Sequence, residues 1–268
     1  MSPRRASIAA AALIALLAGC RAAPSETGSA AAAPAETAPA TRPRLGLLTG
    51  LPLYHPLGAD VAAIAAGTAA VPWQRAALER AFTLEPLDTL SRIPALAPGA
   101  PPTDPLAGLA RLAVIQPRGL SPADNVALDD WVRGGGRLLM VLDPLLTGDY
   151  DLPIVDPRHP PGSAIIPPVV ARWGMSIAAP LPDTDDAAAT GTDTLPGGAG
   201  LPYAWPGSIA LLPGAAGKAC VRHAARIAVC RVGKGQVTLI ADAALFEHPE
   251  LAGENGAVLR AVVLEAVG

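Results

Sequence analysis

The sequence predicts an α/β domain of three layers, with helices on both faces of a mostly parallel sheet and an antiparallel hairpin near the C-terminus. Three observations lead to this prediction. Residues 111–144 read as a strand, a helix and a second strand, an order that favours a right-handed parallel crossover. Both strands are continuous apolar runs, as expected of strands buried on two faces. Residues 219–232 alternate as two short antiparallel strands do.

The first strand and the helix of this unit have clear boundary signals. The apolar run 112–115 stops at Gln116-Pro117, because a residue before proline is disfavoured in the helical region. Ser121 is expected to cap the helix, with Pro122 at the first helical position and Asp124 three residues after the cap. Leu128, Trp131 and Val132 share one face, so the helix is expected to lie on the sheet.

Residues Gly134 to Gly136 end this helix and lead into the apolar run 138–142, which stops at Asp143-Pro144. A phosphate cradle would place its glycines between a strand and the following helix, so these glycines are interpreted as a cap and turn.

The remaining elements are expected, in chain order, as a strand with its loop over 45–53, a helix over 73–82, a short strand over 82–87, a proline-rich connection over 91–105, an irregular excursion over 145–162, a helix over 166–173, a strand over 175–178, a low-order insertion over 183–200, a strand over 208–212, the hairpin, a strand over 236–240 and a helix from Glu254 or Asn255.

The N-terminus predicts export and lipid attachment. Arg4 and Arg5 precede an apolar run of about ten residues, which suits a signal-peptide core and is too short to span a bilayer. The run ends in Leu-Ala-Gly-Cys20, which resembles the bacterial lipobox and implies cleavage after residue 19 and acylation of Cys20. An ordinary secretory signal with an incidental cysteine is the alternative. Residues 1–19 are thus a lipoprotein signal peptide, and the protein is expected on the periplasmic side of the cell envelope, in either the inner or the outer membrane.

Residues 20–44 are predicted to form a disordered tether, because Ala, Pro, Ser, Thr, Glu and Gly dominate them and no large apolar residue occurs. Residues 45–268 are then a single α/β domain. Without residues 1–19 the chain keeps 18 basic residues against 23 acidic ones, and this excess of about five negative charges argues against nucleic acid as a partner.

Several kinds of chemistry lack their usual residues. No serine stands in a Gly-x-Ser-x-Gly elbow, and the four histidines show no metal-ligand spacing, so neither a catalytic residue nor a metal or other cofactor is predicted. Cys220 and Cys230 lie symmetrically about the middle of the expected hairpin, which predicts a disulfide in an exported protein. Two buried thiols are the alternative.

A ligand crevice is the remaining possibility. Thr49, Gln116, Asp143 and Asp242 each follow a predicted strand, where the carboxyl ends of parallel strands meet, and His55 lies in the adjoining loop. The alternative is that these polar residues only satisfy loop backbone and helix caps.

The run 112–144, together with residues 233–263, resembles the accessory domain of uncharacterised ABC-type transport systems, including the gliding-motility auxiliary protein, and DUF4350-type domains. The matching residues are Leu120-Ser121-Pro122, Leu128, Gly135-Gly136, Asp143, Gly235, Asp242 and Asn255. The resemblance covers roughly residues 45–267. It implies a flavodoxin-like or class I glutamine amidotransferase-like fold without the catalytic cysteine, beside a transporter. Members of that family are usually held by transmembrane helices.

The sequence therefore predicts a non-catalytic, lipid-anchored periplasmic accessory or binding protein, with permease subunits of an ABC-type transport system as the expected partners. Two alternatives stay open. One is an enzyme of the same fold, hydrolytic or sugar-modifying, that uses Asp143, Asp242 and His55. The other is a structural envelope lipoprotein.

Overall fold

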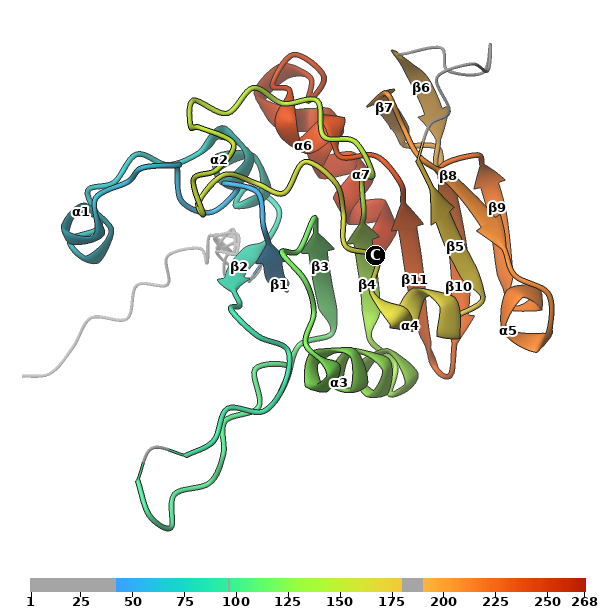
Figure 1. Cartoon of the computed structure of the whole chain (residues 1–268), viewed down its shortest axis with the longest axis horizontal. Coiled ribbons are helices and arrows are strands. Elements are labelled where there is room, and N and C mark those ends of the chain that lie inside the picture. The colour runs from blue at the N-terminus through green and yellow to red at the C-terminus, as the bar shows by residue number, and fades with distance from the viewer. Residues whose placement is uncertain (1–41, 96, 180–189) are drawn as a thin grey trace, which may run out of the picture. The chain divides into compact units, whose positions relative to one another are not determined.

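The computed structural model describes residues 42–95, 97–179 and 190–268, which fold around one mixed sheet (Figure 1). The strand order is β2-β1-β3-β4-β11-β10-β9. The first five strands run parallel and the last two antiparallel, which confirms a mostly parallel sheet with an antiparallel hairpin. The strands are β1 (Arg44–Thr49), β2 (Thr83–Pro86), β3 (Arg111–Ile115), β4 (Arg137–Val141), β9 (Cys220–Ala224), β10 (Ile227–Val232) and β11 (Gly235–Ile240).

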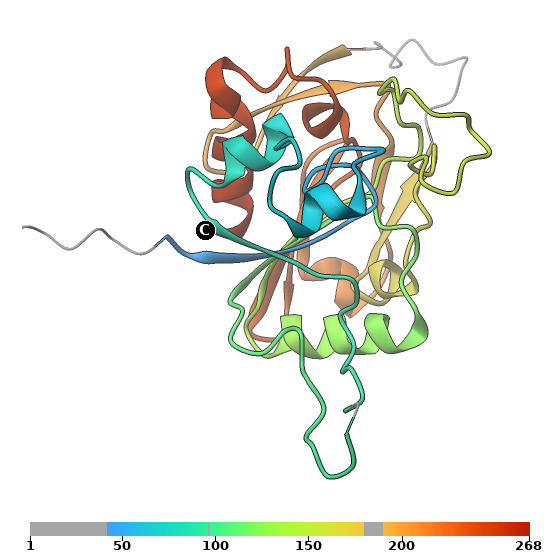
Figure 2. The same ribbon diagram turned by 90° about the vertical axis from the view of Figure 1, so that its left-hand side faces the viewer.

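Helices cover both faces of the sheet because successive side chains of each central strand point to opposite sides. Ala113 and Ile115 of β3 face a core formed with α2 (Trp73–Leu78) and α7 (Ala257–Val267). Leu112 and Val114 face the other core, formed with α3 (Pro122–Arg133) and α4 (Pro168–Arg172). Figure 2 shows α7 and α3 on opposite sides of the sheet.

Helix α3 begins and ends where the sequence predicts. Ser121 and Asp124 form a reciprocal capping box, and Gly134 is the C-cap. Leu128 and Val132 are fully buried against the sheet. Complete burial of an aliphatic side chain of this size contributes about 1.5–3 kcal/mol, so this face holds the helix in place.

The prediction of a low-order insertion over residues 183–200 was wrong for its described part. The strands β6 (Thr190–Thr194) and β7 (Gly200–Ala204) form an antiparallel pair there. Strand β6 has the sequence TGTDT and carries no large apolar side chain, so it lacks the periodicity from which strands are predicted. A second antiparallel pair joins β5 (Met175–Ala178) to β8 (Ser208–Leu211).

Short helices also went unpredicted, because four or five residues are too few to show a helical period. They are α1 (Val61–Ala65), α5 (Ala215–Lys218) and α6 (Ala244–Glu247). The last predicted helix begins slightly later than expected: a 3₁₀ turn, η1 (Glu254–Gly256), precedes α7. The predicted signal peptide, Cys20 and nearly all of the tether lie outside the described residues. Among the helices of the described ranges, none is long and apolar enough to cross a bilayer.

Candidate functional site

The parallel strands end at one edge of the sheet, and the connections that leave this edge diverge between β1 and β3. In the strand order, the chain moves from β1 outward to its neighbour β2, whereas it moves from β3 in the opposite direction to its neighbour β4. Gly50 joins the two strand ends, since its N–H donates to the carbonyls of Ile115 and Gln116 at 3.2 and 3.0 Å. Ligands of open α/β sheets bind at this carboxyl edge, close to such a divergence.

Three of the predicted crevice residues lie together here, fully buried. The amide of Gln116 accepts a hydrogen bond from the backbone N–H of Asp143 at 2.8 Å and donates to its carbonyl at 2.9 Å. The carboxylate of Asp143 accepts from the N–H groups of Leu145 and Ala243, both at 2.8 Å. Asp143 therefore ties the loops after β4 and β11 together.

Asp242 holds the neighbouring backbone in the same way. Its carboxylate oxygens accept from the N–H groups of Ala204 and Ala244, each at 3.0 Å. Each carboxylate oxygen of Asp143 and Asp242 thus has a backbone donor, and neither residue is accessible to solvent. These two side chains do not line the surface pocket of this edge; they hold the loops that form it.

Burial raises the pKa of both carboxyls. For Asp143 the pKa is raised to about 8, mainly by desolvation, with the charges of Asp242 and Glu247 adding to the shift and the two N–H donors opposing it. For Asp242 desolvation raises the pKa to about 7, against its two N–H donors and the positive charge of Arg226. Ionisation of the pair is therefore unfavourable in the folded state.

Thr49 and His55 do not join this cluster. The Thr49 hydroxyl accepts from the N–H of Leu51 at 3.0 Å, so it stabilises the turn after β1. His55 is exposed, and its ring lies edge-on to that of Tyr54 with 4.9 Å between centroids. Within the described ranges, no hydrogen bond links either residue to Gln116, Asp143 or Asp242.

A surface pocket of about 260 Å³ lies over the same edge. The loop after β1, the start of α2, the loop after β4 and helix α6 each contribute to it. Figure 1 shows the yellow-green loop after β4 reaching across the sheet edge toward α2. The lining residues are Pro52, Pro56, Leu57, Pro72, Trp73, Gln74, Asp149, Tyr150, Asp151, Phe246 and Glu247.

Glu247 of α6 is one of the carboxylates that line this pocket, and it was not predicted from the sequence. One of its oxygens accepts from the Tyr150 hydroxyl, and the other accepts from the Thr147 N–H at 3.1 Å. Burial, together with the charge of Glu247, raises the pKa of Tyr150, so the phenol stays protonated and remains a donor. The one signal in the sequence is its place five residues after Asp242, on the short helix after a buried strand.

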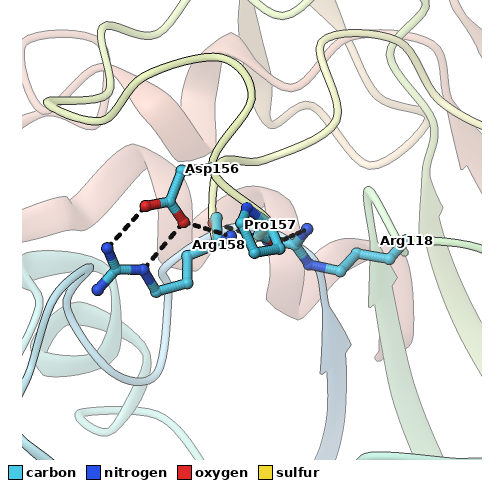
Figure 3. A network of polar contacts seen from close by, with 4 residues as sticks. All are labelled: Arg118, Asp156, Pro157 and Arg158. Carbon is cyan, nitrogen blue, oxygen red and sulfur yellow. Dashed lines mark hydrogen bonds and ion pairs between the residues drawn. The ribbon is translucent and has the colours of Figure 1, made fainter.

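The loop that supplies Asp149, Tyr150 and Asp151 is fixed from a distance by Arg118. This residue follows β3, and its guanidinium donates to the carbonyls of Pro157 and Arg158 at 2.8 and 2.7 Å (Figure 3). The side chain of Arg158 forms an ion pair with Asp156, with 2.7 Å between its Nη2 and the Oδ2 of Asp156. Arg118 therefore clamps the far half of the loop to the sheet edge.

A larger hollow of about 790 Å³ lies elsewhere, between α3 and the connection from β2 to β3. Its lining is mostly apolar and includes Leu106, Val126 and Trp131. The smaller pocket is the better candidate site because carboxylate, amide and aromatic side chains converge there at the carboxyl ends of strands. Among the described residues, no group of three or more His, Cys, Asp or Glu side chains is arranged to hold a metal ion.

Cys220 and Cys230 are joined by a disulfide between β9 and β10. They are directly paired in the strand register, with 4.0 Å between their Cα atoms. Neither cysteine is therefore a free nucleophile, and the bond lies at the far edge of the sheet from β1 and β2.

Comparison with known proteins gives no family. No protein-family model matches the chain, and no curated protein does. Among solved structures, the exo-β-1,4-mannosidase Op5Man5 from Opitutaceae bacterium strain TAV5 is 13% identical with a TM-score of 0.45, over 85% of this chain and 36% of that one. A β-galactosidase from Rahnella sp. R3 is 13% identical with a TM-score of 0.40, over 75% and 29%. The cytoplasmic protein STM1381 from Salmonella typhimurium LT2 is 11% identical with a TM-score of 0.36, over 84% and 100%.

These matches contradict the expectation that the domain is not an enzyme, because four of the similar structures are those of glycoside hydrolases. This chain spans about a third of the length of the mannosidase and of the Rahnella enzyme. Identities of 13% or less and TM-scores below 0.5 assign neither an activity nor a substrate to it. The resemblance to transporter accessory domains stays a prediction.

Proposed function

We propose that this domain binds and chemically processes a small saccharide in the pocket formed by Trp73, Tyr150 and Glu247. The observation that carries the proposal is the convergence of an aromatic ring, a buried amide and a positioned carboxylate at the carboxyl edge of the sheet. Small-molecule sites combine apolar and aromatic walls with a few placed polar groups. A volume of about 260 Å³ suits a ligand below drug size.

Sugar recognition needs two kinds of surface. The apolar C–H face of a sugar ring packs on an aromatic side chain, for which Trp73 and Tyr150 are available. The hydroxyl groups need acceptors, and Glu247, Asp149 and Asp151 offer carboxylate oxygens. The pocket supplies both surfaces.

Glu247 is the proposed acid–base group. Its position is fixed by Tyr150 and Thr147, as expected for a side chain that must meet a substrate proton in a defined geometry. Glycoside cleavage commonly uses a second carboxyl group across the scissile bond, and Asp149 or Asp151 would fill that role. Asp143, Asp242 and His55 take no part in substrate contact in this proposal.

A flavodoxin-like fold is proposed for the domain. The order β2-β1-β3-β4-β11 of the parallel strands corresponds to 2-1-3-4-5, which is the flavodoxin order. This order supports the class I glutamine amidotransferase-like fold that the sequence resemblance implies. It also supports a ligand site at the carboxyl edge between β1 and β3.

Location and partners remain proposals from the sequence. An acyl group on Cys20 would hold the domain on the periplasmic side of the envelope, and permease subunits of an ABC-type transport system would be its partners. Crosslinking in intact cells tests the partner proposal. Recovery of other envelope proteins without any transporter subunit would contradict it.

The function is tested with a panel of mono-, di- and trisaccharides, using calorimetry for binding and chromatography for products. We expect at least one saccharide to bind and to be converted. Glu247→Gln should keep binding and lose conversion, and Trp73→Ala should weaken binding. Asp88→Asn is the matched control, because Asp88 is exposed and lies outside the pocket. No binding across the panel would overturn the proposal and favour a structural envelope lipoprotein. Conversion unchanged in Glu247→Gln would overturn the acid–base role given to Glu247 and the assignment of the reaction to this pocket.

A further inference from the structure

The connection from β1 to α2 carries an apolar segment that packs in neither core of the domain. It runs over residues 57–72, with the sequence LGADVAAIAAGTAAVP, and includes the short helix α1. The structure describes all of these residues and buries none of them; Val61 and Val71 are 78% and 53% exposed. Figure 1 shows α1 projecting from the body of the domain, away from the sheet. A Cβ atom added at Gly58 or Gly67 would meet no atom within 4 Å, so both ends of the helix also lie in open space.

The length and composition of this segment indicate an interaction surface. Valines that are exposed singly are ordinary on a protein, but a contiguous exposed apolar stretch marks a site of contact. Residues 57–72 consist mostly of Ala, Val, Ile and Leu, and Asp60 is their one charged residue. Connections from a strand to a helix usually have about 2–6 residues, whereas this one extends from residue 50 to residue 72. Since the added length does not pack in the cores, its role lies in contact with something outside the domain.

The backbone of the segment is hydrogen-bonded within itself. The Asp60 carboxylate caps α1 by accepting from the Ala62 N–H at 3.1 Å. The Ala63 carbonyl accepts from the N–H groups of Thr68 and Ala69 at 2.9 and 3.2 Å, so the chain after the helix folds back on it. Unpaired peptide groups are costly in an apolar environment, and internal pairing removes that cost. Much of the segment is therefore suited to leave water in its folded form.

The composition of residues 57–72 fits a lipid bilayer better than a protein partner. Protein interfaces take most of their binding energy from Trp, Tyr and Arg, and this segment contains none of them. It also contains no lysine with which to bind an acidic surface. Burial of methyl groups among acyl chains, by contrast, needs neither charge nor a complementary shape. Helix α1 has five residues and is too short to span a bilayer, so the contact is with the interfacial layer.

The predicted anchor leaves this segment within reach of a bilayer. Acylation of Cys20 would place residues 21–41 between the lipid and Arg42, where the described structure begins. A chain of that length spans at most about 70 Å. Strand β1 has six residues and is about 20 Å long, so the connection at its end lies well within this distance of the membrane. Confinement near the bilayer raises the local concentration of lipid, which strengthens even a weak insertion.

We propose that residues 57–72 form a second membrane contact of this protein, in which α1 lies in the interfacial layer of a bilayer and buries Val61 and Val71 among acyl chains. The contact does not depend on the proposed saccharide function. It holds the carboxyl edge of the sheet close to the lipid surface, because Leu57 and Pro72 at the two ends of the segment line the pocket there.

The test follows a polarity-sensitive dye on the processed chain, residues 20–268, with Cys20→Ala. An N-terminal hexahistidine tag in place of the acyl group holds the protein on phosphatidylcholine vesicles that contain a nickel-chelating lipid. The dye is attached to Val61→Cys or, as the matched control, to Val126→Cys, since Val126 is 62% exposed on α3. Cys220 and Cys230 are joined to one another, so the introduced thiol takes the label. We expect the dye at position 61 to shift its emission to the blue on vesicles and to be quenched by a brominated lipid, and the dye at position 126 to do neither.

Two double variants measure how much the exposed valines contribute. Without the tag, partitioning onto phosphatidylcholine vesicles should be about tenfold weaker for Val61→Ser/Val71→Ser, because two apolar side chains are lost from the contact. Val126→Ser/Val221→Ser removes the same side chains from other surfaces, where they are 62% and 57% exposed, and should bind as the parent does. Flotation at high lipid concentration measures the partitioning.

Four outcomes would overturn the proposal. The first is a dye at position 61 that stays accessible to aqueous iodide on vesicles. The second is a blue shift without lipid, accompanied by a doubled mass in light scattering, which would assign the segment to a contact with a second copy of the chain. The third is a blue shift that appears only when membrane proteins are added to the vesicles, which would assign it to a protein partner. The fourth is an equal loss of partitioning in both double variants, because exposed valines would then contribute wherever they lie.

Discussion

The side chain of Gln116 bonds both the N–H and the carbonyl of Asp143, at 2.8 and 2.9 Å, across the carboxyl ends of β3 and β4. Gln116 also has a positive φ of 43°, so the backbone turns sharply as it leaves β3. The side-chain amide of Gln116 therefore takes the place of the next backbone hydrogen bonds between β3 and β4, at the point where the two strands separate into loops. The geometry of the pocket above depends on this connection.

Replacing Gln116 with alanine should destabilise the domain by about 3 kcal/mol. Two buried hydrogen bonds are lost. The N–H of Asp143 is then left without a partner in a buried site, and its carbonyl keeps only the N–H of Ala164. Urea unfolding followed by circular dichroism measures the change. Gln236→Ala is the control, because Gln236 is partly exposed and its side chain makes no hydrogen bond to a described residue; it should cost less than about 1 kcal/mol. Equal losses in both variants would contradict the role given to Gln116.

Asp143 and Asp242 should make the domain less stable as pH rises. Their folded pKa values are raised to about 8 and about 7, above the ordinary value of 3.8. At pH values between the ordinary pKa and the raised pKa, the folded state binds more protons than the unfolded state. The free energy of unfolding therefore falls as pH rises through this range. The contribution of these groups is fully present below about pH 4 and is lost as pH passes about 8.

Urea unfolding at intervals from pH 5 to 8 measures this slope. Asp143→Asn, which cannot ionise, should flatten it, whereas the control Asp88→Asn should leave it as in the parent. Stability that increases steadily over this range in the parent protein would mean that the buried pair is ionised when folded, contrary to the raised pKa values.

Asp124 should link α3 to the connection from β2. One carboxylate oxygen accepts from the Thr89 hydroxyl and the N–H groups of Leu90 and Ser91, and the other accepts from Ser121. Burial alone would raise its pKa, but these hydrogen bonds outweigh burial and hold the pKa well below its usual range. Stability from Asp124 is therefore present above about pH 4 and is lost as pH falls.

Ser121→Ala should cost about 1 kcal/mol, as for the loss of an N-cap, and Asp124→Ala should cost about 2–4 kcal/mol because more bonds are lost. Urea unfolding at pH 7 measures both. Asp130→Ala on the exposed face of the same helix is the control and should change stability little. A smaller loss in Asp124→Ala than in Ser121→Ala would show that Asp124 does not fix the connection.

The elements that could be predicted are those whose signals lie within one stretch of chain. Residues 111–144 carry a pre-proline stop, an N-cap, an apolar stripe and terminal glycines, and β3, α3 and β4 follow them closely. Strand β6 could not be predicted, because its residues are polar and its pairing with β7 is set by tertiary contacts.

For the candidate site, only residues that hold the loops of the pocket were predicted from the sequence, namely Gln116, Asp143 and Asp242. Asp143 and Asp242 lie two residues after the ends of the neighbouring strands β4 and β11, so the strand ends locate them near one another. Glu247 and Tyr150 are 97 residues apart, and their contact depends on how the loop after β4 folds across the edge. Nothing local marks such a loop conformation. His55 was also predicted to belong to the site, but the conformation of the loop after β1 leaves this residue exposed.

Cys20 should carry the lipid that the sequence predicts. Labelling cells with a radioactive fatty acid should mark the parent protein, and Cys20→Ala should abolish the label because no acceptor thiol remains at the processed N-terminus. Ser25→Ala in the predicted tether is the control and should be labelled as strongly as the parent. A Cys20→Ala protein that still incorporates label would exclude the predicted acylation site.

Arg118 should control the order of the loop that forms one wall of the pocket. Its guanidinium donates to two successive carbonyls, so Arg118→Ala leaves both without this partner and frees the far half of the loop. Lysine should not rescue it, since one ammonium cannot reproduce the planar pair of donors. Amide hydrogen exchange should therefore become faster over residues 145–166 in both variants. Arg158→Ala is the matched control: it removes the ion pair with Asp156 but keeps the backbone carbonyls that Arg118 binds. Faster exchange in Arg158→Ala but not in Arg118→Ala would mean that the loop is held by its own ion pair, and that the pocket wall forms independently of β3.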